Sequence, residues 1–485
     1  MFVATHLRDW SARAPYPVGP STIAQVLDHG LTAHPERIAL VDGDRSWTWS
    51  SLDLIVAEVS GTLNRGDVIA WSLPNSAEMV IGFLATMRTG AVWVGLPSKL
   101  SAEERTARTD RAGADRLIAD LDIPRDPSLP RPDASIHPHA PAAIAFTSGS
   151  TGRPKAIVHS QRSLLGPAAV SLHTEPPSDG ERIGTPLDLA ILNVMVLGPL
   201  SAFVRGSAFV VMRSTRPADL AVDVSRHRIT RAFVVPTILH DFVESDVPDG
   251  SLASLDRIVA GGSGADPELQ QRFARRFGVR PTQSYGLSEA PTGVARESLD
   301  DPIGSGRGLP LPHVQLRIGE SEEIVVEPSA FGVWAGTFTP MLGYLDDAAE
   351  TARTLVGDAL HTGDTGSLDP DGALRVTGRL SDKIVRGGAN IDPVTVERAV
   401  LQTPGVRDVA IVGVPDDRLG EVVGALVVVD DGSTVDAAAI EATCIAALSR
   451  SEVPSLIVLA TEIPRNAMGK PDRAAVRGAI TSKRA

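Results

Sequence analysis

The segment from Thr147 to Lys155, TSGSTGRPK, has the composition of a loop that binds phosphate. Glycines let backbone N–H groups approach phosphate oxygens, and serine and threonine hydroxyls add donors that can rotate to suit. The spacing differs from that of a Walker loop, because Pro154 stands between the last glycine and the lysine. The residues expected to hold the phosphates are Thr147, Ser148, Gly149, Ser150, Thr151, Gly152 and Lys155.

Two apolar runs flank this segment and predict the element that presents it. Residues 142–146 are typical of a buried strand, and residues 156–158 can form the second strand of one hairpin. A turn-rich hairpin tip without a ligand is the alternative, since glycine, serine and threonine are frequent in turns. The functional interpretation therefore depends on other motifs along the chain.

Strands and helices alternate on both sides of this hairpin. The first such unit has strands over 67–74 and 91–96 around a helix over 76–89 that Gly90 ends, and a helix is also expected over 22–27. Strand–helix–strand units of this spacing predict parallel sheets joined by right-handed crossovers. After the hairpin, the pattern predicts strands over 208–212, 231–236 and 255–260 and helices over 218–227 and 267–277.

A change of texture near residues 378–382 predicts a domain boundary. The preceding segment from Val314 contains short strands and turns, whereas about a hundred following residues alternate strands and helices in a compact pattern. A chain of 485 residues exceeds the size at which single cores stop growing. We therefore expect two domains, residues 1–379 and residues 380–485.

Composition limits the classes of protein and of partner. The 46 basic and 59 acidic side chains give a formal charge of −13, which argues against nucleic acid or an anionic membrane as a general partner. Positive charge for a phosphate ligand must then be gathered locally. One cysteine, Cys444, allows no internal disulfide, and no run approaches the 18 apolar residues of a membrane span. The N-terminus lacks the features of a secretory signal, so we expect a cytoplasmic protein.

The segment TSGSTGRPK resembles the phosphate loop of the adenylate-forming superfamily, which contains acyl-CoA synthetases, adenylation domains and luciferases. Four other motifs are similar to elements of that superfamily and follow in the expected order. They are SYGLSE at 284–289, HTGDTG at 361–366 with Gly378-Arg379, RGGANI at 386–391, and PRNAMGK at 464–470. The resemblance spans the chain and implies an α/β fold. Its large N-terminal domain has parallel-rich sheets and a distorted β-barrel, and its small C-terminal α+β domain is mobile.

In the superfamily, the second motif contacts ATP and magnesium, and its chemistry is plausible by itself. Tyr285 offers a flat face to a purine, Ser288 a hydroxyl to a phosphate, and Glu289 a hard oxygen ligand to Mg²⁺. A turn that caps a helix is the alternative. The resemblance adds Gly262, Ser263, Ser284 and Gly286 to the expected ATP site.

The remaining motifs imply the other catalytic parts. By resemblance, Asp364 accepts hydrogen bonds from the ribose hydroxyls and Arg379 supports the ribose and phosphate side. Lys470 enters the active site for the first half-reaction. Arg386, Gly387 and Gly388 line the passage of a pantetheine thiol, and the two glycines leave room close to the backbone. Ser381 replaces the more usual aspartate or lysine of the family hinge, which leaves the pivot residue open.

The resemblance implies an AMP-forming acid–thiol ligase of the acyl-CoA synthetase type. A carboxylate attacks the α-phosphorus of ATP, pyrophosphate leaves, and the thiol of coenzyme A attacks the acyl-adenylate. Such chemistry depends on positioning and electrostatics rather than on a nucleophilic residue. The expected cofactors are ATP, Mg²⁺ and coenzyme A or carrier-protein phosphopantetheine. The expected partners are a small carboxylic acid and a carrier protein if one replaces coenzyme A, and a homodimer is one possible assembly.

One departure from the family pattern concerns the acid. Where acyl-CoA synthetases usually carry PLFH, this chain has Pro186-Leu187-Asp188-Leu189. Asp188 stands at or beside the position where amino-acid adenylation domains hold the substrate's ammonium group. It faces water, pairs with a local donor, or meets a cationic substrate, because an unpaired buried carboxylate is costly. The expected substrate pocket contains Asp188, Leu189, Val235 and Gly261.

Two rival functions stay open at this point. A stand-alone adenylation enzyme could load an amino or β-amino acid onto a separate carrier protein, an alternative that Asp188 favours and the RGGANI segment opposes. A nucleotide-binding regulator without catalysis is the other, although Glu289, Asp364, Arg379 and Lys470 are all present.

Overall fold

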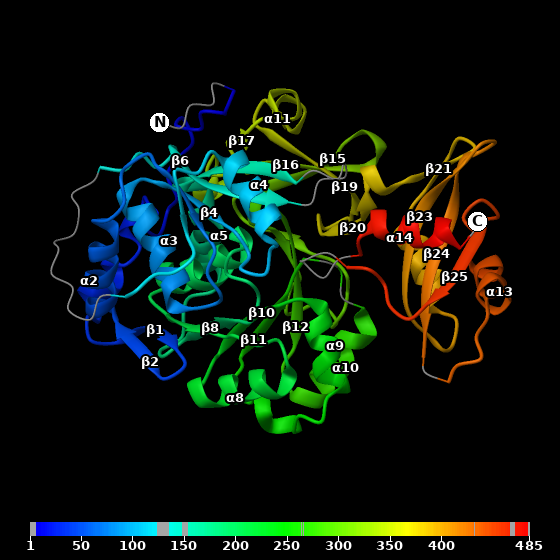
Figure 1. The fold of residues 1–485 in the computed structure, drawn as a ribbon, viewed down its shortest axis with the longest axis horizontal. Helices are drawn as coiled ribbons and strands as arrows, with labels where there is room; N and C mark the ends of the chain where they lie inside the picture. The colour runs from blue at the N-terminus through cyan, green and yellow to red at the C-terminus, as the bar shows by residue number, and fades with distance from the viewer. Residues whose placement is uncertain are drawn as a thin grey trace. The chain divides into compact units, whose positions relative to one another are not determined.

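The chain folds into two compact units in a computed structural model that describes residues 6–123, 135–147, 154–262, 264, 266–430, 432–465 and 471–483. One unit contains residues 1–317 and 325–362, and the other contains residues 318–324 and 363–485 (Figure 1). The two domains expected from the sequence, residues 1–379 and 380–485, divide the chain at a different point, and that boundary stays a prediction. The mixed α/β class with a larger and a smaller unit is confirmed.

A nine-stranded sheet forms one layer of the larger unit. Its inner pairs, from β12 through to β1, are parallel, and antiparallel hairpins extend both edges. In spatial order its strands are β14 (Leu309–Pro310), β13 (Ala290–Arg296), β12 (Pro281–Leu287), β11 (Arg257–Ala260), β10 (Arg231–Val234), β8 (Arg182–Thr185), β9 (Ala208–Val211), β1 (Ile38–Asp42) and β2 (Arg45–Thr48).

A six-stranded sheet forms a second layer and carries the predicted hairpin. Its strands β3, β4, β5 and β6 run parallel, and β7 returns antiparallel to β6. In spatial order its strands are β17 (Gly343–Tyr344), β7 (Lys155–Ser160), β6 (Pro141–Thr147), β4 (Val92–Gly95), β3 (Val68–Trp71) and β5 (Arg116–Ile118).

The helices of the larger unit connect and cover these strands. Ser76 caps the first turn of α3 by accepting a hydrogen bond from Met79, and Gly90 ends the helix with φ 76°. Both ends were therefore predicted correctly. The helices are α1 (Asp28–Ala33), α2 (Trp49–Ser60), α3 (Ala77–Thr89), α4 (Ala102–Ala112), α5 (Gln161–Thr174), α6 (Leu192–Met195), α7 (Ser201–Val204), α8 (Pro217–His227), α9 (Pro236–Glu244), α10 (Pro267–Phe277) and α11 (Ala348–Thr354).

The prediction of a helix over 22–27 is wrong. This segment forms only a 3₁₀ turn, Ile23–Gln25, and the first α-helix begins at Asp28. Thr22 makes no capping hydrogen bond, whereas Ile23, Val26 and Leu27 are almost fully buried. Tertiary packing of these three side chains therefore decides the local conformation over helix propensity.

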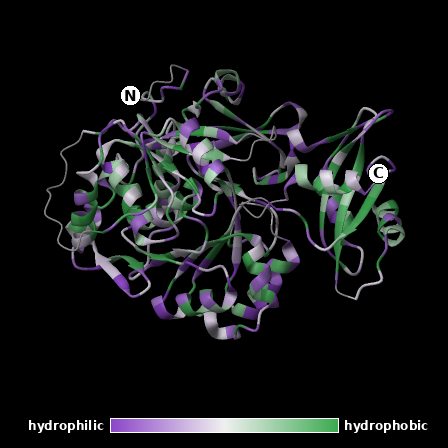
Figure 2. Cartoon of the chain, in the orientation of Figure 1, coloured by the Kyte–Doolittle hydropathy of each residue, from purple (hydrophilic) through white to green (hydrophobic). Residues whose placement is uncertain are grey.

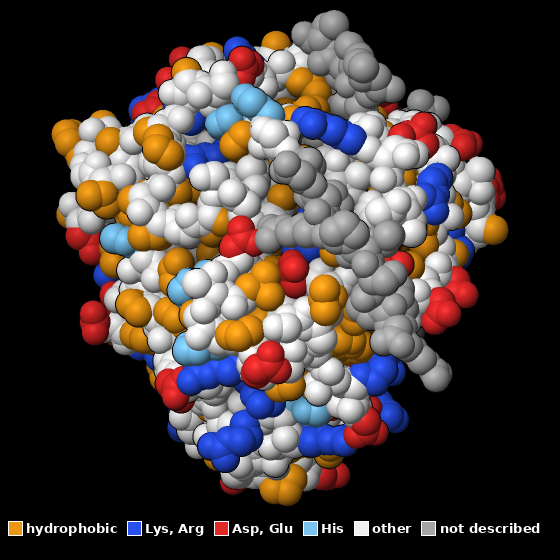
Figure 3. Space-filling view, turned by 90° about the vertical axis from the view of Figure 1, so that its left-hand side faces the viewer, with side chains coloured by type: hydrophobic (Ala, Val, Ile, Leu, Met, Phe, Trp, Pro, Cys, Tyr) orange, Lys and Arg blue, Asp and Glu red, His pale blue; other side chains and the backbone are white. Residues whose placement is uncertain are grey.

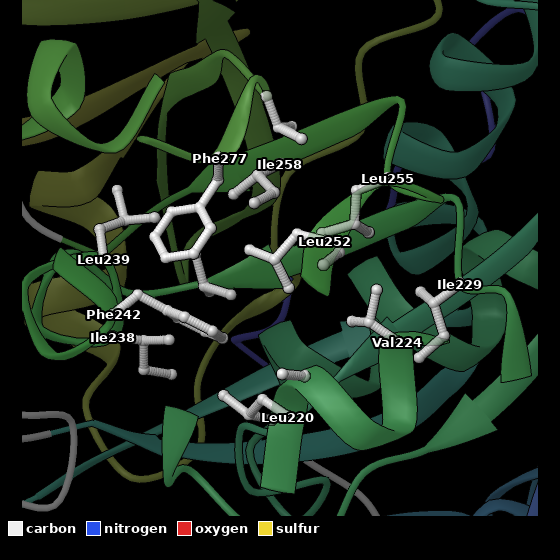
Figure 4. Packing of buried hydrophobic residues seen from close by; sticks show 14 of the residues in the cluster. Leu220, Val224, Ile229, Ile238, Leu239, Phe242, Leu252, Leu255, Ile258 and Phe277 are labelled. Carbon is white, nitrogen blue, oxygen red and sulfur yellow. The ribbon is translucent and has the colours of Figure 1, made fainter. Parts of the chain in front are cut away.

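An apolar cluster lies between the nine-stranded sheet and α8, α9 and α10. Figure 4 shows Leu220 and Val224 of α8, Phe242 of α9 and Phe277 of α10 pointing toward one another. Phe242 meets the ring of Phe277 edge-on at 5.6 Å. The cluster lines an apolar pocket of about 20 Å³, and Pro186 and Val234 form part of its wall. Val235 of the expected acid pocket packs against this cluster.

A five-stranded sheet contains the segments where the chain passes between the two units. It occupies the region from Val314 in which the sequence predicts short strands and turns. Its strands are β15 (Val314–Ile318), β16 (Glu323–Pro328), β19 (Ala359–Leu368) and β18 (Leu355–Val356) in that order, with β20 (Leu374–Arg379) paired to β19.

The smaller unit has its own sheet and its own apolar core on both faces. Its strands are β22 (Ala389–Ile391), β21 (Ile384–Arg386), β24 (Gly420–Val429) and β23 (Val406–Asp416), with β25 (Leu456–Ala460) parallel to β24. Its helices are α12 (Pro393–Leu401), α13 (Ala437–Ala447) and α14 (Arg473–Ser482). Hydrophobic residues concentrate in its strands (Figure 2). None of the described helices in the chain has the length and apolar character needed to cross a bilayer.

Candidate active site

The predicted hairpin is present in the six-stranded sheet. Strands β6 and β7 are antiparallel, and Thr147 pairs with Lys155 where the loop between them begins and ends. The loop residues Ser148, Gly149, Ser150, Thr151 and Gly152 lie outside the described residues. The structure thus confirms the two flanking strands and not the phosphate contacts.

Lys155 is held at the end of β7 by an acidic and an aromatic partner. Its Nζ lies 2.5 Å from Glu350 Oε1 of α11 and 4.9 Å from the centre of the Tyr344 ring. The side chain of Lys155 is about one-third exposed. It is therefore partly neutralised, and a phosphate that used it would compete with Glu350.

The SYGLSE motif forms the end of β12 and the turn into β13, not a helix cap. Ser284 and Tyr285 lie on β12, paired with Arg296 and Ala295 of β13, and Ser288 and Glu289 form the turn. Ser288 Oγ accepts a long hydrogen bond of 3.5 Å from Asn193. Gly286 lies on β12 directly after Tyr285 and is exposed.

Tyr344 connects the phosphate-loop hairpin with the SYGLSE motif. The sequence analysis did not identify this residue. The residue lies on β17 beside Ile157 of β7, and its hydroxyl donates a 2.9 Å hydrogen bond to Glu289 Oε1. Burial, reinforced by the Glu289 carboxylate, raises the pKa of Tyr344, so the hydroxyl stays protonated as a donor. Lys155, Tyr344 and Glu289 are thus one contiguous cluster in the larger unit.

His159 connects strand β7 with the turn that contains Ser288 and Glu289. It is fully buried on β7, and its Nε2 lies 2.8 Å from the carbonyl oxygen of Ser288. Burial lowers the pKa of His159 to about 4, so the ring is neutral at pH 7 and Nε2–H donates to the carbonyl. The turn that carries Glu289 is therefore fixed to the strand that carries Lys155.

Glu289 fits the chemistry of a magnesium ligand. Its Oε1 accepts from Tyr344, while Oε2 makes no hydrogen bond to any residue that the structure describes. Mg²⁺ is usually bound by one or two carboxylates together with substrate phosphates. No group of three His, Cys, Asp or Glu side chains suited to a metal occurs among the described residues. Glu289 offers one carboxylate oxygen, which matches a Mg²⁺ ion bound by one carboxylate together with substrate phosphates.

The expected walls of the acid pocket come from the ends of β10 and β11. Val235 follows β10, and Gly261 and Gly262 follow β11. Gly262 has φ 90°, and a Cβ placed on Gly261 would meet nothing within 4 Å. The chain therefore leaves open space beside Gly261. Ser263 lies outside the described residues.

Asp188 has a local hydrogen-bond donor. Its Oδ1 accepts a 2.9 Å hydrogen bond from the N–H of Ala190, and the next residue, Leu189, is fully buried. Burial raises the pKa of Asp188, and the charge of Lys99 opposes that shift. The carboxylate therefore has a local partner without any cationic substrate.

Asn75 is a second residue that sequence reasoning missed. Its Nδ2 donates to the carbonyl oxygens of Leu187 at 2.9 Å and Met212 at 3.1 Å, and its Oδ1 accepts from the N–H of Leu189 at 2.9 Å. One side chain thus holds both ends of the segment that contains Asp188. The signal was weak, because a lone asparagine after a strand is usually a turn residue.

Replacing Asn75 by alanine is expected to raise the KM for the acid about tenfold, because two carbonyls and one N–H lose their partner and the 187–189 segment loosens. The KM for ATP should change less than about twofold. Both values follow from ATP–pyrophosphate exchange kinetics. Asn64→Ala, which removes an exposed asparagine whose side chain donates to Asp67, is the matched control. An equal rise in both KM values would show that Asn75 has no specific role in the acid pocket.

The aspartate of the TGD element and the arginine of the GR element lie in the smaller unit as one pair. Asp364 of β19 and Arg379 of β20 are register partners, and Arg379 Nε lies 2.6 Å from Asp364 Oδ1. The carboxylate is nearly buried and the guanidinium is half exposed. The two residues are thus brought together, as the resemblance implied.

The RGGANI segment forms a tight hairpin between β21 and β22. Gly387 and Gly388 are its two turn residues, with φ 59° and 88°, which explains the need for glycine at both. Arg386 donates a 2.6 Å hydrogen bond to the carbonyl oxygen of Ser451. In this structure the arginine therefore anchors the loop after α13.

Lys470 lies outside the described residues, but the base of its loop does not. Arg465 and Pro471 form an antiparallel bridge, and Asp472 N–H donates to the carbonyl oxygen of Pro464 at 2.8 Å. The segment that contains Lys470 is thus closed at its base.

Two family models match the chain. The model of the AMP-binding enzyme covers residues 27–130 and 121–345, and the model of the AMP-binding enzyme C-terminal domain covers residues 395–470. Together they include the SYGLSE turn and the lysine loop.

Curated relatives and a solved structure agree with these matches. The chain is 29% identical to indoleacetate–CoA ligase of Aromatoleum aromaticum over 95% of its own length and 98% of that enzyme. It is 30% identical to a probable non-canonical nonribosomal peptide synthetase, CymA, of Salinispora arenicola, over 97% of this chain and 6% of that protein. The o-succinylbenzoate CoA synthetase of Bacillus subtilis, solved with its acyl-adenylate intermediate, superposes with a TM-score of 0.82 at 25% identity, covering 93% and 98% of the two chains.

These matches bear on the predicted enzyme class. CoA ligases similar to this chain over nearly its whole length, and a structural neighbour that holds an acyl-adenylate, confirm an AMP-forming acid–thiol ligase that activates a carboxylic acid for transfer to coenzyme A. The regulator without catalysis is thereby the weaker alternative. With most of its length matched by the family model, the chain belongs to the family of AMP-binding enzymes.

Proposed function

We propose that this enzyme joins a carboxylic acid with an apolar, ring-bearing body to coenzyme A through an acyl-adenylate. The observation that carries the proposal is the Lys155–Tyr344–Glu289 cluster, which unites the phosphate-loop strand with the expected magnesium ligand. The chemical difficulty is that a carboxylate is a poor acyl donor, because its oxygen is a poor leaving group. Converting the carboxylate to its mixed anhydride with AMP supplies a better leaving group, AMP itself.

In the first half-reaction, a carboxylate oxygen of the acid attacks the α-phosphorus of ATP and pyrophosphate leaves. We assign Glu289 as the ligand of Mg²⁺, a cation that would offset charge on the phosphates when bound. Thr147, Lys155 and the loop between them would hold the leaving pyrophosphate, and Lys470 would bring a second cation to the transferring group. Ser284, Tyr285, Gly286 and Ser288 would line the nucleotide. Asp364 and Arg379 would orient the ribose.

In the second half-reaction, the thiol of coenzyme A attacks the acyl carbon and AMP leaves. A new C–S bond forms, the C–O bond to AMP breaks, and the thiol proton is released. The RGGANI hairpin would guide the pantetheine arm, because Gly387 and Gly388 present bare backbone. This role requires residues 380–485 to reorient about a hinge near Arg379 between the two half-reactions, as in the superfamily.

The acid class follows from the pocket walls and the relatives. Leu189 is fully buried, and Val235 is partly buried and packs against an apolar cluster. Indoleacetate and o-succinylbenzoate, named for two similar enzymes, both carry a ring. An apolar wall gains about 25 cal/mol for each Å² of ring surface that it removes from water.

Activation of an amino acid for a carrier protein is the second candidate. Similarity to a segment of a peptide synthetase favours it. The hydrogen bond from Ala190 to Asp188 opposes it, because the carboxylate needs no ammonium group as partner. Asp188→Asn keeps an oxygen that can accept this bond while it removes the charge.

The test is ATP–pyrophosphate exchange with aryl, fatty, α-amino and β-amino acids, followed by thioester formation with coenzyme A. We expect aryl acids to turn over and Asp188→Asn to change their kcat/KM less than about threefold, since the charge touches no part of the acid. Exchange only with amino acids, lost in Asp188→Asn by about 100-fold or more, would refute the aryl acid and support the second candidate. No exchange with any acid would refute the enzyme class.

A further inference from the structure

Helix α4 contacts both strand ends from which the phosphate loop emerges. The guanidinium of Arg108 lies over the ring of Phe146 on β6, 5.9 Å from its centre, and Phe146 directly precedes Thr147. One turn later, Arg111 donates to the carbonyl oxygen of Pro154, directly before Lys155. The last turns of α4 therefore place two guanidinium groups at the mouth of the hairpin.

The cations at this mouth differ in their partners. Lys155 is paired with Glu350, and Arg111 Nε lies 3.1 Å from Asp346. Arg108 makes no hydrogen bond or ion pair with any residue in the ranges that the structure describes. The acidic residue whose charge acts on Arg108 is Glu104. The carboxylate of Glu104 already accepts a hydrogen bond from Ser101 N–H at the start of the helix.

Arg108 is also only partly exposed to water. Burial lowers the pKa of Arg108, and the charge of Glu104 offsets this only in part. A guanidinium keeps its charge in proteins and carries five N–H donors, so a desolvated one without a carboxylate is a strong partner for an anion. Phosphate oxygens suit its planar fork.

The charge of the whole chain makes this position unusual. The net charge is −13, and Lys, Arg, Asp and Glu side chains are interspersed over the face of the larger unit in Figure 3. A phosphate ligand thus gains nothing from a general positive field and depends on single cations. Beside the strand ends that carry the phosphate loop, Arg108 is such a cation, and it forms no ion pair with any of the described residues.

We propose that Arg108 binds the β- and γ-phosphates of ATP at the mouth of the β6–β7 hairpin and holds the pyrophosphate as it leaves. The inference rests on the proposed function, because it assumes that the hairpin binds ATP. Coenzyme A also carries phosphates, so the same guanidinium could serve that substrate instead. The experiment below separates the two sources.

The test compares Arg108→Gln with wild type in three measurements. In ATP–pyrophosphate exchange, we expect the KM values for ATP and for pyrophosphate to rise about tenfold, equivalent to one charge-assisted hydrogen-bonded contact, with the KM for the acid unchanged. In calorimetry without acid, the Kd of pyrophosphate with Mg²⁺ should rise by a similar factor. In thioester formation from supplied acyl-AMP, the KM for coenzyme A should stay the same.

Two further variants control for charge and for folding. Arg105→Gln removes the same charge one turn earlier, where the guanidinium donates to the carbonyl oxygen of Leu100, and should leave all three measurements unchanged. Arg108→Lys keeps the charge without the fork and should recover part of the loss. An unchanged melting temperature shows that the Phe146 contact is not required for folding.

The contrary outcomes are distinct. A raised KM for coenzyme A alone would assign Arg108 to that substrate and overturn the proposal, and equal losses in Arg105→Gln would reduce it to a general charge effect. Unchanged binding of pyrophosphate in Arg108→Gln would also overturn it. A wild-type protein that binds pyrophosphate but shows no exchange with any acid would refute the proposed function and leave the assignment of Arg108 intact.

Discussion

Replacing Lys470 by alanine is expected to lower acyl-adenylate formation by about 100-fold or more, because a transition state with negative charge on the transferring phosphoryl group loses a cation in a water-poor site. Thioester formation from supplied acyl-AMP should fall less than about threefold, since the proposed reorientation would withdraw the lysine in that step. Single-turnover measurements of the two half-reactions give both values.

Lys483 supplies the matched control for this variant. It lies near the same end of the chain and donates to the carbonyl oxygen of Leu459 at 2.9 Å. Lys483→Ala should leave both half-reactions unchanged. Equal losses of both half-reactions in Lys470→Ala would contradict the two-conformation account, since one lysine would then serve both steps.

Glu289→Gln should lower adenylation by about 100-fold and raise the Mg²⁺ concentration for half-maximal exchange about tenfold. The amide still accepts from Tyr344, so the turn keeps its shape while the negative charge is lost. A magnesium titration of ATP–pyrophosphate exchange measures both effects. Tyr344→Phe keeps the charge and removes the hydroxyl, so its loss should be smaller, about threefold to tenfold.

Glu268→Gln is the control for a lost carboxylate, because Glu268 lies exposed on α10. It should leave the magnesium dependence unchanged. A magnesium requirement that is the same in Glu289→Gln and in wild type would remove Glu289 as the metal ligand.

Local patterns in the sequence predicted most elements of the fold. Ser76 and Gly90 mark the two ends of α3, and the apolar runs around the phosphate loop became β6 and β7. In each case the deciding interactions are caps or strand periodicity within a few residues. The helix expected over 22–27 failed because burial of Ile23 outweighed such local signals.

The partners within the site could not be predicted in the same way. Tyr344 reaches Glu289 across 55 residues of sequence, and Asn75 reaches Leu187 across 112. Neither spacing carries a local signal, because only the sheet order places β17 beside β7. Motifs therefore predicted candidate groups for the reaction, while the residues that position those groups became visible only in the fold.

The most direct measurement of the central claim is the fate of carboxylate oxygen. The acid that is most active in exchange is prepared with ¹⁸O in its carboxylate and converted with ATP and coenzyme A. Attack on the α-phosphorus followed by cleavage of the acyl C–O bond predicts one ¹⁸O in AMP and none in pyrophosphate. Unlabelled AMP, or label in inorganic phosphate with ADP as product, would contradict the acyl-adenylate account.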